Sequence, residues 1–414
     1  MEFNPSPSTV MHIDLNSCFA TIEQQANPLL RDKPIAVAAY ASPNGCILAA
    51  SIEAKTYGVK TGMRVKDGKS LCPRLIVLPP DPWKYRVVHL RLRNIFKTYT
   101  QHFAPRSIDE FVLHFDSSSS HLANKNLLDL ASQIRDKIYK IGEWLHVSIG
   151  IAPNRFLAKT ASGMMKPKGL VEINKDSYLN CFHKLKLTDL CGIAKHNEIR
   201  LNNMGIYSVI DLYNSPIWQS KAAFHSIAGY YWYVRLRGYE IDDVTFARRS
   251  YGNSYSLPKP FATPYELGPI LAKLVEKTSF RLRRAGFGAT GVHLAIRYRD
   301  GRFWHKGESL PRVIFDSRDV YKEMYRLLLL SPINTPVMNL AVSCFGLQKL
   351  ENLQLNLFEN VIKKRDLTKA LDDVNHRWGD FVVTTARMIE TSQYIPDRIA
   401  FGNVKELEEF TQVH

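Results

Sequence analysis

Residues 8–25, STVMHIDLNSCFATIEQQ, place a short strand directly before a helix. Residues 8–15 are a mostly apolar run of strand length, whereas residues 16–25 have apolar side chains at helical spacing. The apolar positions of that helix are Cys18, Phe19 and Ile22. Asp14 is the acid at the end of the strand, so the sequence predicts a carboxylate at a strand-to-helix junction.

The start of this helix is a candidate site for an anion. Backbone N–H groups in the first turn of a helix lack intrahelical partners, and the helix dipole favours negative charge there. The amides of Ser17, Cys18 and Phe19 can therefore cradle a phosphate group.

A second group of acids lies in Arg106-Ser-Ile-Asp-Glu-Phe-Val-Leu-His-Phe115. Its β-branched and aromatic residues favour a strand, and ionised Asp109 and Glu110 cost free energy there if they are buried without partners. Taken alone, Asp14 is better explained as a helix N-cap and the acidic pair as a solvated strand end, the commoner case for a lone acid. Successive side chains of a strand also point to opposite faces, so both acids can serve one site only at a bulge, turn or strand end.

The order of predicted elements divides the chain into three regions. Up to about residue 173, strands and helices alternate, which indicates a mixed α/β domain. Its later elements are predicted helices over 85–96 and 122–139 and strands over 103–115 and 147–152. Residues 174–240 are predicted to be mostly helical. Residues 248–350 form a predicted α+β unit with helices over 265–285 and 318–330 and strands over 291–299, 313–315 and 337–347.

The charge distribution favours a polyanionic partner. The chain has 55 Lys and Arg against 39 Asp and Glu, a formal net charge of +16. Between Arg248 and Lys349 there are 17 Lys and Arg against 7 Asp and Glu, a net of +10 in about a quarter of the chain. Because Lys and Arg placed on phosphates release condensed counterions, nucleic acid is the first candidate.

Composition and cysteine spacing argue against several classes of protein. With 45% hydrophobic and 23% charged residues, the 414-residue chain is typical of a globular protein with several domains. The six cysteines include no C-x-x-C pair, which argues against a zinc site or a disulfide framework. No signal peptide or apolar run of membrane-span length is present, so a cytoplasmic protein without membrane contact is expected.

The three acids suit phosphoryl transfer assisted by magnesium. Two divalent ions can activate an attacking oxygen and stabilise a leaving one. Mg²⁺ takes only one or two protein carboxylates alongside waters and substrate phosphates. Asp14, Asp109 and Glu110 would supply these ligands from neighbouring strands.

Four ordered motifs resemble those of Y-family DNA polymerases, the DinB and UmuC group that copies damaged templates. They are Ile13-Asp-Leu-Asn-Ser-Cys-Phe-Ala-Thr-Ile-Glu23, Asn44-Gly-Cys-Ile-Leu-Ala-Ala-Ser-Ile-Glu-Ala-Lys-Thr-Tyr-Gly-Val-Lys60, Ser107-Ile-Asp-Glu110, and Gly150-Ile-Ala-Pro-Asn-Arg-Phe-Leu-Ala-Lys159 followed by Lys166-Pro-Lys-Gly169. The resemblance implies an error-prone, DNA-directed DNA polymerase. It would perform translesion synthesis with dNTPs on primer-template DNA, including damaged template, in SOS-type damage tolerance.

The resemblance also assigns roles to individual residues. The three acids would hold two Mg²⁺ ions while the primer 3′-hydroxyl attacks the α-phosphate of the nucleotide. Phe19 would be the steric gate that excludes a 2′-hydroxyl, although an aromatic ring at helical spacing is also typical of a core. Lys55 and Lys166 match positions that contact the triphosphate.

The implied fold is an α+β multidomain right hand. Residues 1–17 and 84–173 would form the palm, 18–83 the small fingers, 174–240 a helical thumb, 241–247 a linker and 248–350 the α+β little finger. Leu190-Cys-Gly-Ile-Ala-Lys195 resembles the thumb's helix-hairpin-helix, in which backbone N–H groups contact DNA phosphates, with Ala194 in place of the second hairpin glycine.

Residues 351–414 are a predicted C-terminal tail with a partner motif. Gln354-Leu-Asn-Leu-Phe358 looks like the peptide with which bacterial polymerases dock on the sliding clamp. An extended segment of this kind presents alternate side chains to an apolar pocket, here those of Leu355, Leu357 and Phe358 beside Gln354. The alternative is an ordinary linker.

The resemblance leaves the subgroup open. Asn44-Gly45-Cys46 leans towards UmuC and Lys166-Pro-Lys-Gly169 towards DinB, while many DinB-type members have Tyr and Arg where this chain has Ile52 and Lys55. Two other classes remain as alternatives, a noncatalytic homologue that binds DNA and clamp, and a two-metal nuclease. A monomer that works at the nucleoid is expected.

Overall fold

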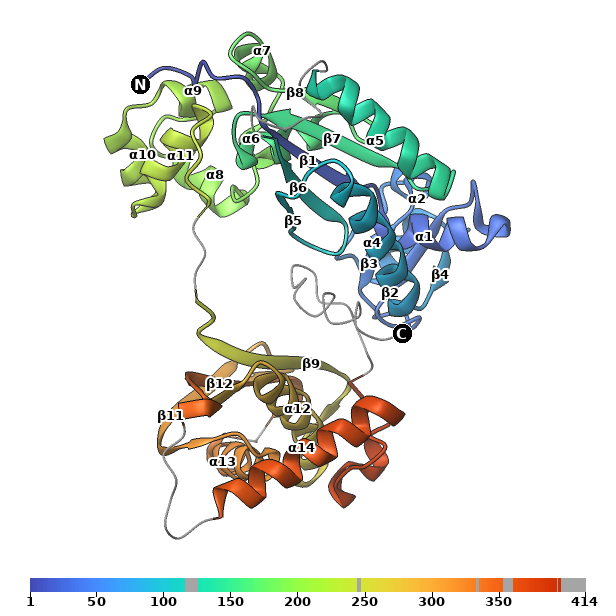
Figure 1. Ribbon diagram of the computed structural model, residues 1–414, viewed down its shortest axis with the longest axis vertical. Coiled ribbons are helices and arrows are strands. Elements are labelled where there is room, and N and C mark those ends of the chain that lie inside the picture. Colours follow the sequence, from blue (N-terminus) through green and yellow to red (C-terminus); the bar gives the residue numbers. More distant parts are fainter. Residues whose placement is uncertain (116–125, 244–246, 333–334, 353–359, 393, 396–414) are drawn as a thin grey trace. The chain divides into compact units, whose positions relative to one another are not determined.

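The computed structural model describes residues 1–115, 126–243, 247–332, 335–352, 360–392 and 394–395 (Figure 1). The chain forms two compact units, Met1–Val244 and Thr245–Asp397, and each has its own hydrophobic core. Both combine sheets with helices, so the predicted α+β class is confirmed. Within the described ranges, no helix has the length and apolar character needed to span a membrane.

The first unit is built on a five-stranded sheet with the strand order β5–β6–β1–β7–β8. Its strands are β1 (Val10–Leu15), β5 (Phe103–Pro105), β6 (Glu110–His114), β7 (Val147–Ala152) and β8 (Leu170–Glu172). The central β1 is antiparallel to both β6 and β7, and Asp14 lies opposite Glu110 on one side and Ser148 on the other. The register therefore brings the first acidic motif beside the second.

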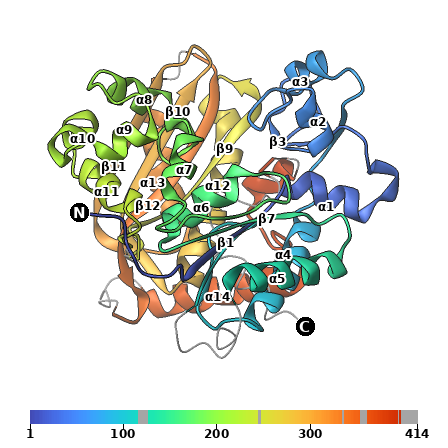
Figure 2. The same cartoon turned by 90° about the horizontal axis from the view of Figure 1, so that it is seen from above.

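Alternate residues of β1 face two different helical layers. Met11, Ile13 and Leu15 are buried in a core that they share with α4 (Pro82–Lys97) and α5 (Leu127–Ile141). The opposite face is covered by α6 (Arg155–Met164), which Figure 2 shows on the other side of β1 from α4 and α5. Polar residues of β1 with even numbers thus lie between the sheet and α6.

Gly150 lets α6 lie close against the sheet. A Cβ at this position of β7 would be 2.0 Å from the carbonyl oxygen of Ala158 and 2.3 Å from the backbone nitrogen of Ser162. A larger residue would force α6 away from the sheet.

A smaller sheet also belongs to the first unit. The strands β2 (Ile35–Ala38), β3 (Ile47–Ala50) and β4 (Ile76–Leu78) form a sheet with a small core of its own beside α2 (Ile52–Thr56) and α3 (Val65–Leu71). Helix α1 (Cys18–Ala26), by contrast, contributes to the core of the five-stranded sheet.

After β8 the first unit is helical, as predicted. Its helices are α7 (Tyr178–His183), α8 (Lys195–Asn202), α9 (Val209–Asn214), α10 (Ile217–Phe224) and α11 (Ala228–Leu236). Their apolar side chains share a core with α6.

The second unit is a four-stranded antiparallel sheet with the order β11–β10–β12–β9. The strands are β9 (Ser250–Phe261), β10 (Phe287–Tyr298), β11 (Phe303–Ile314) and β12 (Val337–Lys349). The helices are α12 (Pro264–Arg284), α13 (Ser317–Leu330) and α14 (Val361–Trp378). The first two share the core of the sheet.

The structure corrects several predicted elements. Residues 103–115 are two paired strands rather than one, because the chain reverses at residues 106–109 between β5 and β6. β9 was not predicted, and β11 is much longer than the predicted 313–315. Both are edge strands with many exposed residues, so they lack the regular apolar alternation that marks a half-buried strand. Helix α14 was not predicted either.

Candidate active site

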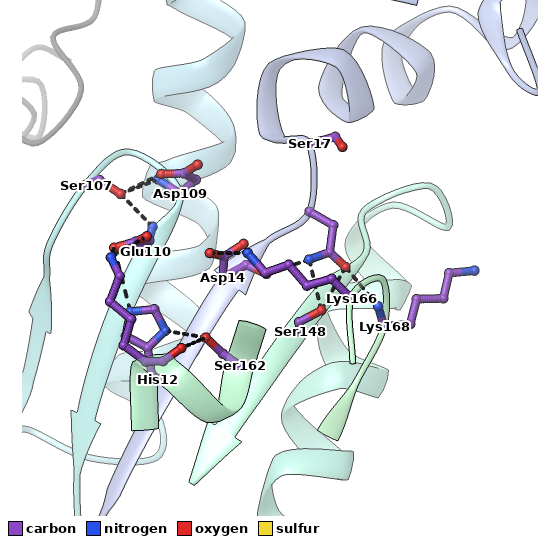
Figure 3. Close-up of polar contacts among 12 residues, drawn as sticks. His12, Asp14, Ser17, Ser107, Asp109, Glu110, Ser148, Ser162, Lys166 and Lys168 are labelled. Carbon is purple, nitrogen blue, oxygen red and sulfur yellow. Dashed lines mark hydrogen bonds and ion pairs between the residues drawn. The ribbon is translucent and has the colours of Figure 1, made fainter. Parts of the chain in front are cut away.

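Asp109 and Glu110 can serve one site because strand β6 begins between them. Glu110 is the first residue of β6, whereas Asp109 lies in the preceding connection and its carbonyl oxygen accepts a hydrogen bond from the backbone nitrogen of Leu15 at 2.9 Å. Ser107 fixes this connection, since its hydroxyl donates to Asp109 Oδ1 at 2.5 Å and accepts from the backbone nitrogen of Glu110 at 3.0 Å. The strand-end arrangement that two adjacent acids require is therefore present (Figure 3).

Glu110 is held by basic groups from β1 and α6. Lys159 Nζ donates to both carboxylate oxygens of Glu110, at 2.8 and 2.6 Å. The ring of His12 is buried and its Nε2 lies 3.7 Å from Glu110 Oε2. Burial alone would raise the pKa of Glu110, but His12 and Lys159 outweigh it and lower that pKa to about 2. The carboxylate is ionised at neutral pH.

Asp14 pairs with the loop that follows α6. Lys166 Nζ lies 2.7 Å from Asp14 Oδ2, as Figure 3 shows. The same loop is fixed by Asn16, whose Oδ1 accepts from the backbone nitrogen of Lys168 at 2.9 Å and whose Nδ2 donates to Ser148 Oγ at 3.0 Å. Buried polar contacts thus set the place from which Lys166 reaches the acid.

Ser17 and Lys55 lie beside these groups. Ser17 is the N-cap of α1, with a left-handed φ of 53°, and its hydroxyl accepts a hydrogen bond from Lys55 Nζ at 2.8 Å. Partial burial lowers the pKa of Lys55, the charge of Lys166 lowers it further, and Asp14 opposes both. Two neighbouring ammonium groups at a helix start are a suitable environment for a polyanion.

Cys18 and Phe19 have buried side chains. Burial raises the pKa of the Cys18 thiol, and the negative charges of Asp109 and Asp14 raise it further, which places the start of α1 close to both acids. The Phe19 ring is 3% exposed and stacks on Tyr85 of α4, with ring centroids 4.3 Å apart. Phe19 is therefore part of the core; its role as a steric gate stays a prediction.

The acids repel one another, as expected of a site that binds cations. Burial raises the pKa of Asp109; the hydrogen bond from Ser107 opposes this, and the charges of Asp14 and Glu110 add to it. A divalent cation between these hard oxygen donors would offset both the free-energy cost of burying ionised carboxylates and the repulsion between them. The donor set therefore fits Mg²⁺. Across the described ranges, no three His, Cys, Asp or Glu side chains are gathered closely enough to enclose a metal ion by themselves. Lysine contacts hold Glu110 and Asp14 instead.

The sequence interpretation missed three residues of this site. The sequence motifs predict no role for Lys159, His12 or Ser107. His12 lies two residues before Asp14, so the period-two alternation of a strand places both on one face and could have identified it. Lys159 carries no such local signal, because its contact with Glu110 depends on how α6 packs.

Two further motifs, the hairpin and the clamp peptide, stay predictions. The hairpin candidate at 190–195 runs from the end of a short 3-10 turn (Leu187–Asp189) to the start of α8, and its Gly192 has a φ of +105° that favours glycine. The clamp-peptide residues Gln354, Leu355, Leu357 and Phe358 lie outside the described residues.

Comparisons with family models and known proteins agree on one family. The model of the impB/mucB/samB family matches residues 13–163, and the model of that family's C-terminal domain matches residues 248–357. The DNA polymerase IV of Pelotomaculum thermopropionicum is 29% identical over 395 residues, which cover 94% of this chain and 97% of the relative. The DNA polymerase IV 1 of Bacillus subtilis strain 168 is 31% identical over 379 residues, which cover 89% and 90%.

Solved structures share the fold. The Y-family DNA polymerase chimera Dbh-Dpo4(243-245)-Dbh has a TM-score of 0.71 at 24% identity, covering 84% of this chain and 99% of that chain. An insertion ternary complex of Dbh DNA polymerase has a TM-score of 0.56 at 23% identity, covering 81% and 98%.

Proposed function

The chain belongs to the impB/mucB/samB family as a DinB-type Y-family DNA polymerase, and we propose that Asp14, Asp109 and Glu110 bind the metal ions of its nucleotidyl transfer. The enzyme is a DNA-directed DNA polymerase of the translesion class. Of the two subgroups that the motifs left open, DinB is the one that the relatives support.

The observation that carries the metal proposal is the shared strand end of β1 and β6. Asp14 and Glu110 are register partners there, and Asp109 precedes Glu110 in the connection fixed by Ser107. The chemistry that two bound Mg²⁺ ions supply is activation of the primer 3′-hydroxyl and stabilisation of the leaving pyrophosphate. The carboxylates would position the ions and offset their positive charge, and no covalent intermediate with the protein is required.

The basic residues beside the acids are proposed to bind the nucleotide. Lys55 and Lys166 are close enough for the charge of Lys166 to lower the pKa of Lys55, and a triphosphate would relieve that repulsion. The backbone amides of Ser17, Cys18 and Phe19 at the start of α1 would donate hydrogen bonds to its phosphate oxygens. We further propose that the edge of the Phe19 ring meets the sugar and excludes a 2′-hydroxyl.

Primer extension tests the proposal directly. Purified protein with Mg²⁺ and dNTPs should extend a primer on undamaged and on lesion-bearing template, and D109A should extend neither. A protein inactive in both forms would instead be a DNA-binding adaptor. Release of nucleotides in the absence of dNTPs would identify a nuclease.

The DNA and clamp partners are proposed from charge and motif. The net charge of +10 between Arg248 and Lys349, from 17 Lys and Arg against 7 Asp and Glu, would hold the primer-template through its phosphates, independently of sequence. The peptide ending in Leu357 and Phe358 would dock on the bacterial sliding clamp. Changing both residues to Ala should abolish capture of the protein on immobilised clamp; undiminished capture would remove the assignment. Such a protein would work as a monomer at the nucleoid in the cytoplasm.

A further inference from the structure

Both acids on the α6 side of the sheet have a lysine as a resident counter-ion. Glu110 receives two hydrogen bonds from Lys159 Nζ, and Asp14 lies 2.7 Å from Lys166 Nζ. Lys166 is already assigned to the nucleotide by the motif. Lys159 has no assigned role, although it occupies both oxygens with which Glu110 would bind a metal ion.

The contact of Lys159 with Glu110 is built into the fold and is not a chance surface pair. The Glu110 side chain is 20% exposed and the His12 side chain 2%. His12 Nδ1 lies 3.1 Å from Ser162 Oγ, and the Ser162 hydroxyl in turn donates to the backbone carbonyl of Lys159 at 2.8 Å. One turn of α6 is therefore connected to Glu110 through both the side chain and the backbone of Lys159.

The approach of α6 to the sheet fixes the same contact. Gly150 of β7 leaves no Cβ between the sheet and the backbone of Ala158, the residue before Lys159. The packing of α6 therefore places the ammonium group of Lys159 against Glu110. A charge-assisted contact to both carboxylate oxygens is also stronger than a neutral hydrogen bond.

We propose that Lys159 is a positioning residue that holds Glu110 before the metal ion arrives and keeps metal affinity low until nucleotide is bound. The inference rests on the proposed function of Glu110 as a metal ligand. A dication that binds this carboxylate must either displace the ammonium group of Lys159 or share the carboxylate with it, and the two cations repel each other. The triphosphate of the nucleotide supplies the negative charge that offsets this repulsion, so metal and nucleotide bind together.

Mn²⁺ binding without DNA or nucleotide measures the proposed competition. Titration followed by the electron paramagnetic resonance of free Mn²⁺ should show that K159Q binds the ion roughly tenfold more tightly than wild type. K159R keeps the positive charge and should bind as weakly as wild type. The matched control is K175Q, which removes a charge from an exposed lysine of the same unit and should also behave as wild type.

The gain must depend on Glu110. The double variant K159Q/E110Q should lose the tighter binding, because no carboxylate remains for the ion to share. Equal Mn²⁺ affinity of wild type and K159Q, or a gain that persists in the double variant, would overturn the proposal. Thermal unfolding of the same proteins gives a second readout: without metal K159Q should melt below wild type, and Mn²⁺ should raise its melting temperature by more.

Steady-state kinetics separate positioning from nucleotide binding. A positioning residue predicts that K159Q lowers kcat with little change in KM for dNTP, and that K159R restores part of kcat. A rise in KM alone would make Lys159 a triphosphate ligand and overturn the inference. Wild-type protein that fails to extend a primer would refute the proposed function itself, whereas an active wild type with unchanged Mn²⁺ binding in K159Q would refute only this role.

Discussion

His89 of α4 supports the connection that carries Asp109. Its Nδ1 lies 2.8 Å from the carbonyl oxygen of Ile108, and its ring stacks on Phe111 with centroids 4.8 Å apart. Burial lowers the pKa of His89 to about 4; the hydrogen bond to Ile108 opposes this shift and the charge of Arg93 adds to it. The folded protein therefore holds a neutral imidazole that donates to the backbone beside the active-site acid.

This histidine makes stability depend on pH. Because the unfolded chain takes up a proton near pH 6.5 and the folded chain only near 4, the stability present above pH 6.5 is lost as pH falls towards 4. H89Q keeps a hydrogen-bond donor but does not titrate. Between pH 7 and pH 5, the free energy of unfolding of wild type should therefore fall by roughly 2 kcal/mol more than that of H89Q, as measured by urea unfolding. Parallel pH profiles of the two proteins would contradict the prediction.

Phe19 combines a core contact with a proposed contact to the sugar. F19A should lower the preference for dNTP over rNTP, measured as the ratio of kcat/KM, by roughly tenfold or more. It should also destabilise the first unit by roughly 3 kcal/mol, since the ring is buried against Tyr85.

A variant of the stacking partner provides the control for Phe19. Y85F keeps the stacked ring but removes the hydroxyl that donates to Glu23 Oε1 at 2.9 Å. It should reduce stability without changing sugar selection. If F19A and Y85F affect sugar selection equally, Phe19 acts through general packing and is not the gate.

At the scale of elements, α6 organises the site. It covers the polar face of β1, carries Lys159 and shares a core with the helices that follow β8. Its N-cap is Asn154, which is 1% exposed. The Asn154 Oδ1 accepts from the backbone nitrogen of Leu157 at 2.8 Å, and its Nδ2 donates to the carbonyl oxygens of Arg235 at 2.9 Å and Tyr239 at 3.0 Å.

The two functions of Asn154 can be separated by substitution. N154A removes the cap and leaves two carbonyl groups without their donor, so it should cost roughly 3 kcal/mol of unfolding free energy. N154S keeps a capping oxygen and should lose only the part of the unfolding free energy that comes from the contacts with the two carbonyl groups. Urea unfolding measures both; equal losses in N154A and N154S would show that the cap contributes nothing.

At the scale of the whole molecule, the segment that follows the second unit's sheet is part of that unit. Lys273 of α12 is 6% exposed, and its Nζ donates to the carbonyl oxygens of Thr391 at 2.7 Å and Tyr394 at 2.5 Å. Arg283 of the same helix makes two hydrogen bonds to Asp372 of α14, at 2.8 and 2.7 Å. Residues that the sequence predicted only as part of a C-terminal tail thus provide hydrogen-bond acceptors for two buried cations.

The Arg283–Asp372 pair yields a prediction about the second unit. D372A leaves the guanidinium, whose side chain is 7% exposed, without its main partner and should destabilise the unit by roughly 3 kcal/mol. R283L/D372L removes both charges and should cost less than D372A alone. Thermal unfolding of the three proteins checks this order, and a double variant less stable than D372A would contradict it.

Residues close in the sequence were enough to predict much of this protein. The strand ending at Asp14, the helix after it and β7 follow from local periodicity, and the chemistry of the three acids follows from their side chains. The motifs indicated the family that the comparisons confirm. Local signals failed for β9 and β11, because edge strands bury too little to need an apolar alternation.

The sequence by itself determined which chemical groups are present, because side-chain type and spacing are local properties of the chain. Only the tertiary structure decided how they meet. The start of β6 at Glu110 lets two adjacent acids serve one site, since the chain turns before a regular strand would separate them. The close approach of α6 over Gly150 brings Lys159 to Glu110 across 49 positions of sequence, a contact set by packing that no local pattern encodes.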